Sequence, residues 1–170
     1  MKQFILGGAR SGKSTLAETL AIKSNKKVIY IATGQALDAE MQTRIQQHQT
    51  QRSTDWQTIE EPIALGKVVA TFNDVQYCVL VDCLTLWITN CLLSEDKYCW
   101  AAQKKALLEE LKIFKGDLIL VSNEVGQGVV PLGEINRQFV DETGWLHQCL
   151  AQVCEKVILV VAGLPQILKD

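Results

Sequence analysis

The feature that most constrains the fold of this sequence is a glycine-rich loop between an apolar run and a helical pattern. Residues 7–14 match the phosphate-binding consensus GxxxxGK[ST] in full. Glycine lets the backbone turn tightly, so that successive N–H groups point at phosphate oxygens, and the helix that follows adds the positive end of its dipole. The alternative is an ordinary glycine turn between a strand and a helix. It is a weak alternative, because all eight positions fit the consensus and the flanking strand and helix patterns are also present. The predicted nucleotide contacts are Gly7, Gly8, Ala9, Arg10, Ser11, Gly12, Lys13 and Ser14.

Short apolar runs and longer helical patterns alternate along the chain. The apolar runs cover 4–6, 28–32, 77–81, 118–121 and 157–161, with a weaker one over 57–60. They are continuous, which is typical of strands buried on both faces of a sheet. Helices are predicted over 13–24, 36–52, 63–72, 84–93, 97–114 and 133–155. Because this repetition builds parallel sheets, we predict an α/β fold of the P-loop NTPase-like (RecA-like) class, mostly parallel, with helices on both faces.

Length and composition exclude several classes of protein. A chain of 170 residues predicts a single domain over 1–170. Its 48% hydrophobic and 21% charged residues exclude disorder and coiled coils. The net charge of −2 offers no general attraction for nucleic acid or anionic membranes, so neither is expected as a partner. The longest apolar run, 157–164, is too short to span a membrane, and no secretory apolar region follows Met1, so we expect a cytoplasmic protein.

A carboxylate follows the apolar run over 78–81. In nucleotide sites of this kind, an acidic residue at the end of a neighbouring strand binds Mg²⁺ together with the hydroxyl of the phosphate loop. Asp82 and Ser14 are therefore the predicted Mg²⁺ ligands, and Lys13 is predicted to reach the outer phosphates. The alternative for Asp82 is that it caps a helix starting near Thr85.

The cysteines and histidines add less. The six cysteines contain no CxxC pair, so free buried thiols are expected rather than a zinc site or disulfides. His147 lies in a predicted helix with no other reactive group nearby in the sequence, and we interpret it as structural. His48 shares one predicted helix face with Arg44 and Arg52, a setting that suits a polyphosphate, and neutral imidazole is a competent nucleophile. Spacing alone still favours a solvated surface histidine.

Several stretches together resemble one family. These are the phosphate loop, Tyr-Ile-Ala-Thr at 30–33, Leu-Asp-Ala-Glu-Met at 37–41, Arg-Ile-Gln-Gln-His at 44–48, Asp-Cys-Leu-Thr at 82–85, and Ser-Asn-Glu-Val-Gly-Gln-Gly-Val-Val-Pro at 122–131. The chain resembles the bifunctional adenosylcobinamide kinase / adenosylcobinamide-phosphate guanylyltransferases of cobalamin assembly. The resemblance runs from residue 5 to about 164, and the pairing of His48 with the motif at 123–131 is its most specific part.

The resemblance implies two reactions. The terminal hydroxyl of adenosylcobinamide takes the γ-phosphoryl group of ATP or GTP. A histidine matching His48 then attacks the α-phosphorus of GTP, expels pyrophosphate and passes GMP to adenosylcobinamide phosphate, which gives adenosylcobinamide-GDP. The resemblance thus implies His48 as a catalytic residue, and it implies a homotrimer. Together with the phosphate-loop prediction, the expected catalytic residues are His48 and Lys13 and the expected cofactor is Mg²⁺. The resemblance adds these nucleotide contacts: Thr33, Gly34, Gln35, Gln49, Thr50, Gln51, Arg52, Glu60 and Asp82.

The sequence departs from the family at Gln47, where a second histidine is common, and in the segment after the nucleophile, which is less basic than usual. Two alternatives remain open. One is a small-molecule kinase without guanylyl transfer. The other is a nucleotide-dependent regulatory binding module, although no NKxD motif for guanine follows the run over 118–121.

Overall fold

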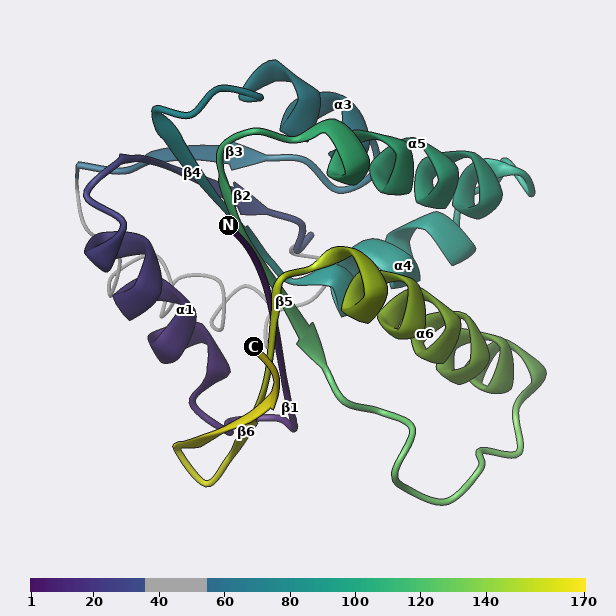
Figure 1. Ribbon diagram of the computed structural model, residues 1–170. Coiled ribbons are helices and arrows are strands. Elements are labelled where there is room, and N and C mark those ends of the chain that lie inside the picture. Colours follow the sequence, from purple (N-terminus) through teal and green to yellow (C-terminus); the bar gives the residue numbers. More distant parts are fainter. Residues whose placement is uncertain (36–54) are drawn as a thin grey trace.

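A seven-stranded sheet runs through the molecule in the spatial order β3-β2-β4-β5-β1-β6-β7 (Figure 1). The computed structural model describes residues 1–35 and 55–170, and the helix predicted over 36–52 lies outside them. Every neighbouring pair of strands is parallel except β6 and β7. The strands are β1 (Lys2–Gly7), β2 (Lys27–Ala32), β3 (Gln57–Glu60), β4 (Tyr77–Asp82), β5 (Asp117–Asn123), β6 (Lys156–Val161) and β7 (Leu164–Lys169).

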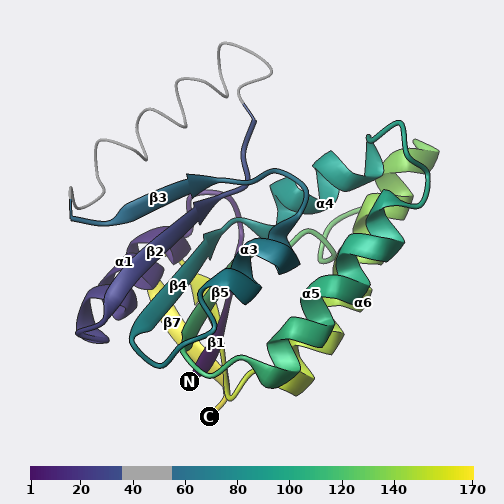
Figure 2. The ribbon, with the colours of Figure 1, turned by 90° about the horizontal axis from the view of Figure 1, so that it is seen from above.

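The described helices cover both faces of this sheet unequally, as Figures 1 and 2 show. On one face lies α1 (Lys13–Lys23), which buries Ala17 and Ala21, one turn apart, against the strands. The other face carries α3 (Leu65–Thr71), α4 (Leu84–Leu92), α5 (Cys99–Ile113) and α6 (Glu134–Val153). The predicted fold class is confirmed, including the helices on both faces.

The core lies in two layers because successive strand residues point to opposite faces. In β1, Phe4 and Leu6 pack under α3 to α6, whereas Ile5 packs under α1. The larger layer is centred on Trp87, fully buried, whose ring meets that of Trp100 edge to face at 5.2 Å. This burial on both faces explains why the strands are continuous apolar runs.

The predicted strands all form, including the weak candidate at 57–60, which is β3. The prediction omitted β7, an exposed antiparallel edge strand. Its sequence lacks an alternating pattern and contains Pro165, which is tolerated on an edge strand because no ladder donor is needed there. A two-residue turn, Ala162 (φ 51°) and Gly163 (φ 80°), joins it to β6.

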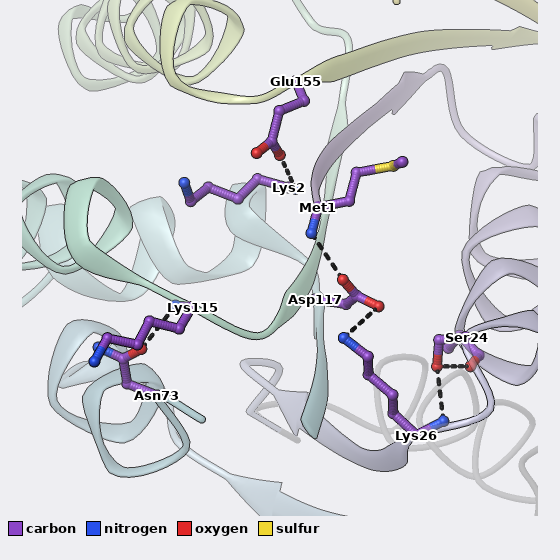
Figure 3. Close-up of polar contacts among 9 residues, drawn as sticks. Met1, Lys2, Ser24, Lys26, Asn73, Lys115, Asp117 and Glu155 are labelled. Atoms are coloured by element: carbon purple, nitrogen blue, oxygen red, sulfur yellow. Dashed lines mark hydrogen bonds and ion pairs between the residues drawn. The ribbon is translucent and has the colours of Figure 1, made fainter. Parts of the chain in front are cut away.

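Polar contacts fasten the end of the sheet opposite the phosphate loop (Figure 3). The Asp117 carboxylate, at the start of β5, binds the amino group of Met1 at 2.7 Å and Lys26 Nζ at 2.9 Å. Nearby, Lys2 N donates to Glu155. Burial alone would raise the pKa of Asp117, but hydrogen bonds and charge from the two cations outweigh it and lower that pKa. No helix of the described residues is long and apolar enough to cross a membrane.

Candidate nucleotide-binding site

The phosphate loop closes tightly between β1 and α1. Arg10 (φ 55°) and Gly12 (φ 94°) both adopt left-handed backbone conformations, and Ser11 N donates to Gly8 O at 3.3 Å. Gly7 is fixed by space: a Cβ there would lie 2.4 Å from Ser11 Oγ and 2.7 Å from Val160 O. The sequence therefore builds a loop that only glycine at position 7 fits.

Lys13 lies inside this loop, with only 8% of its surface exposed. Its Nζ donates to Gly8 O at 3.0 Å. Burial lowers the pKa of Lys13, and the neighbouring Cys83 and Asp82 oppose part of that shift. In the described part of the chain, Ser11 Oγ is buried without a hydrogen-bond partner. A buried cation and an unsatisfied hydroxyl in one loop are groups that an anion would satisfy.

Asp82 ends β4 at the same edge of the sheet, and one of its oxygens accepts a hydrogen bond from the Tyr30 hydroxyl at 3.1 Å. The alternative in which Asp82 caps a helix is wrong, since α4 begins at Leu84 with Cys83 as its N-cap. Asp82 lies close enough to Lys13 to affect its pKa, and Ser14 belongs to the first turn of α1. A carboxylate and a hydroxyl are hard oxygen donors, so these residues fit Mg²⁺, which needs few protein ligands beside phosphates and water.

Other predicted contacts lie further along this edge. Thr33 is fully buried, and its hydroxyl donates to Cys83 O at 2.6 Å and accepts from Cys83 N at 3.0 Å, joining the ends of β2 and β4. Gly34 and Gln35 follow it, half-buried and exposed, and Glu60 is an exposed residue at the end of β3. With strands spaced by about 4.8 Å, Glu60 lies four strands from the phosphate-loop strand, roughly 19 Å away. The structure therefore separates these residues from the phosphate loop, with Asp82 between the two groups.

The remaining predicted site residues lie outside the described residues. They are the nucleophile His48 and the nucleotide contacts Gln49, Thr50, Gln51 and Arg52. Their roles remain predictions. Gln35, the last described residue before this segment, lies just past the carboxyl end of β2, on the same edge as Asp82.

The structure also brings to the site two side chains of the motif at 123–131, to which the sequence prediction gave no individual role. Asn123 ends β5, and its Nδ2 donates to Thr85 Oγ1 at 3.0 Å. Glu124 follows, with its backbone N–H donating to Gly7 O at 3.0 Å and its Oε1 accepting from Gly126 N at 2.7 Å. The signal was the one that found Asp82, namely polar residues directly after an apolar strand.

The chain is similar over its whole length to proteins of one family. Residues 3–168 match the family described as "Cobinamide kinase / cobinamide phosphate guanyltransferase". The bifunctional adenosylcobalamin biosynthesis protein CobP of Pseudomonas aeruginosa is 54% identical, over 99% of this chain and 98% of that protein. The bifunctional adenosylcobalamin biosynthesis protein CobU of Escherichia coli is 36% identical, over 96% of this chain and 97% of that protein.

Solved structures with little sequence identity share the fold. The flagellar accessory protein FlaH from Methanocaldococcus jannaschii matches with a TM-score of 0.54 and 16% identity, over 99% of this chain and 77% of that one. The RadB recombinase matches with a TM-score of 0.50 and 16% identity, over 93% of this chain and 73% of that one. These likenesses show a shared fold.

Proposed function

We propose a function on the premise that this chain belongs to the cobinamide kinase / cobinamide phosphate guanyltransferase family. The chain phosphorylates adenosylcobinamide with ATP or GTP. It then transfers GMP from GTP, by way of a guanylyl group on His48, to give adenosylcobinamide-GDP. The single observation that carries the proposal is the closed phosphate loop around a buried Lys13, in a chain that matches this family over nearly its whole length.

The described residues supply the electrostatics of phosphoryl transfer. The loop presents backbone N–H groups to the phosphates, and Lys13 is placed to neutralise charge on the outer ones. We propose that Ser14 and Asp82 hold Mg²⁺ there, which when bound neutralises charge that develops between the β- and γ-phosphates. Because Lys13 is largely shielded from water, its interaction with a phosphate is stronger than that of a surface lysine.

The second reaction divides GMP transfer into two displacements. A ring nitrogen of His48 forms a bond to the α-phosphorus of GTP while the bond to pyrophosphate breaks. A phosphate oxygen of adenosylcobinamide phosphate then displaces the histidine. Both nucleophiles carry a free lone pair near neutral pH. The carboxyl edge of the sheet supports this assignment, because the phosphate loop, Asp82 and Gln35, which leads into the segment with His48, all lie along it.

The test is covalent labelling of the purified protein by GTP carrying the label at either the α- or the γ-phosphate, with Mg²⁺ present. We expect acid-labile label from α-labelled GTP only, lost in His48→Asn and kept in the control Gln42→Asn from the same segment. A separate assay follows phosphate transfer from γ-labelled ATP to adenosylcobinamide. Kinase activity without covalent label would leave a small-molecule kinase, and nucleotide binding without either reaction would leave a regulatory binding module.

The homotrimer implied by the family resemblance and the cytoplasmic location expected from the sequence belong to the same proposal. The subunit number is measured by size-exclusion chromatography with light scattering, with and without GTP. A particle of three chains is the expected result.

A further inference from the structure

We propose that Glu124 is the general base of the kinase step, taking the proton from the acceptor hydroxyl as that oxygen attacks the γ-phosphorus. This inference rests on the proposed function and assigns a role within it to a residue that the sequence left without one. Three observations carry it: the position of Glu124 in the sheet, the way its carboxylate is held, and the chemistry of the two reactions.

The position of Glu124 follows from the order of the strands. Strand β5 lies between β1, which leads into the phosphate loop, and β4, which ends in Asp82. Asn123 is in register with Gly7, and Glu124 N donates to Gly7 O at 3.0 Å. The backbone of Glu124 therefore lies beside the first residue of the phosphate loop, and its carboxylate lies near His147 of α6, whose pKa it affects. For the proposed transfer, the acceptor hydroxyl approaches the γ-phosphate in line from this part of the sheet edge.

The carboxylate of Glu124 is held in place and still has an open oxygen. Its Oε1 accepts from Gly126 N at 2.7 Å. In the described part of the chain, no hydrogen bond to Oε2 is found, and the residue is half-buried rather than enclosed. The preceding residue is also fixed, because Asn123 Nδ2 donates to Thr85 Oγ1 at 3.0 Å. One oxygen thus orients the group and the other is available to a proton.

The other described carboxylates on this edge are occupied or distant. Asp82 is the residue proposed to hold Mg²⁺. Glu61 Oε1 accepts from the backbone N–H groups of Ile63 and Ala64, at 2.9 and 2.7 Å. Glu60 ends β3, on the far side of β2 and β4 from the phosphate-loop strand. Among the described residues, Glu124 is therefore the carboxylate placed for proton transfer at the phosphate loop.

Only one of the two reactions needs such a base. In the kinase step the nucleophile is an alcohol, whose O–H bond must break as the new O–P bond forms and the bond between the γ-phosphorus and the departing ADP or GDP breaks. The proton passes to Glu124 Oε2 and later to water. In guanylyl transfer the nucleophiles are a neutral imidazole and a phosphate oxygen, which already carry free lone pairs. Loss of the base should therefore slow the kinase step selectively.

The experiment compares Glu124→Gln with the native chain in both reactions. Glutamine keeps an oxygen for Gly126 N but cannot accept the proton. We expect single-turnover phosphate transfer from ATP to adenosylcobinamide to fall by about 100-fold or more, while covalent labelling by α-labelled GTP stays within threefold. Glu124→Asp should recover part of the kinase rate, and the control Glu95→Gln, exposed between α4 and α5, should change neither reaction.

The other outcomes contradict either the role of Glu124 or the proposed function. A kinase rate within threefold of native in Glu124→Gln overturns it directly. Equal loss of kinase rate and covalent labelling assigns Glu124 a structural role at the phosphate loop instead. A native chain that phosphorylates adenosylcobinamide without covalent labelling contradicts only the guanylyl half of the proposed function, and the kinase comparison still decides on Glu124. A native chain with no kinase activity removes the proposed kinase step and the base together.

Discussion

His147 shows how a single buried side chain couples the core to the site. It lies on α6 with 9% of its surface exposed, its Nε2 is 2.8 Å from Ser122 Oγ, and its ring meets that of Phe4 edge to face. Burial lowers its pKa from 6.5 to about 4, and the charge of Glu124 opposes part of that shift. The neutral ring therefore packs against the end of β5, as expected for a structural histidine.

This pKa predicts a stability change in mild acid. The unfolded chain binds a proton at His147 below about pH 6.5 and the folded chain only below about pH 4, so the stabilising contribution is complete above pH 6.5 and declines as the pH falls toward 4. The total loss is roughly 3 kcal/mol. Urea unfolding at pH 7 and pH 4.5 should show a smaller loss of stability for His147→Gln than for the native chain. Equal losses in the two proteins would contradict the assignment.

A second residue-scale prediction concerns Gly7. In Gly7→Ala, the added methyl group would meet Ser11 Oγ and the backbone oxygen of Val160, and the backbone oxygen cannot rotate away. We expect a loss of about 1–3 kcal/mol in the free energy of unfolding and weaker GTP binding. Gly8→Ala is the matched stability control, because nothing lies within 4 Å of a Cβ there. Urea unfolding without nucleotide measures both, and equal stability of the two variants would refute the steric argument.

At the scale of elements, the hairpin of β6 and β7 supports the phosphate loop. Gly163 N, in the hairpin turn, donates to Ser11 O at 2.8 Å, and a Cβ on Gly12 would lie 3.3 Å from the Gly163 Cα. An exposed edge strand thus reaches the loop that carries the phosphate contacts. The parallel sheet sets the position of that loop, and the turn of the antiparallel hairpin stabilises it through the contacts of Gly163.

One of the two residues in this hairpin turn, Ala162, is poorly suited to its backbone conformation, whereas Gly163 is well suited. We therefore expect substitutions at the two positions to change the stability in opposite directions. Both turn residues have positive φ, a conformation that disfavours alanine and suits Asn-Gly pairs. Ala162→Asn should stabilise the protein by up to about 1 kcal/mol, and Gly163→Ala should destabilise it by about 1 kcal/mol. Thermal unfolding with and without GTP measures both effects. The same sign of change in both variants would contradict this account.

At the scale of the whole molecule, the cysteines report on global unfolding. All six are free, five are buried on the two faces of the sheet, and Cys149 alone is half-buried. Burial also raises the pKa of Cys154 to about 12, which suppresses its reactive thiolate. We expect a thiol reagent to label one cysteine rapidly in the native protein and six in guanidinium chloride, with Cys149→Ser removing the rapid phase. Rapid reaction of several thiols in the native protein would show that the core opens locally.

The parts of the fold and of the candidate site that could be predicted from the sequence are those whose residues are close together in the chain. The phosphate loop, Lys13 and Asp82 were found because their motif and the strands before them are contiguous in sequence. Strand β7 escaped because an exposed edge strand with Pro165 has no apolar pattern. The Thr33 hydroxyl joins β2 to residue 83, 50 positions away, a contact that no local pattern encodes. Glu124 belongs to the motif at 123–131, which the sequence did indicate, but its position beside Gly7 depends on the strand order, which no local pattern encodes.

The place of β1 in the sheet also bears on how the protein is made. This strand is synthesised long before its neighbours β5 and β6, with Lys2 in register with Leu118 and Gln3 with Lys156. At synthesis rates of 5–20 residues per second, on the order of 10 to 30 s pass before both neighbours exist. Through that interval the nascent chain carries an unpaired apolar strand and a phosphate loop that nothing braces. The phosphate loop can therefore take its folded form only once β5, β6 and the turn at Gly163 have been made.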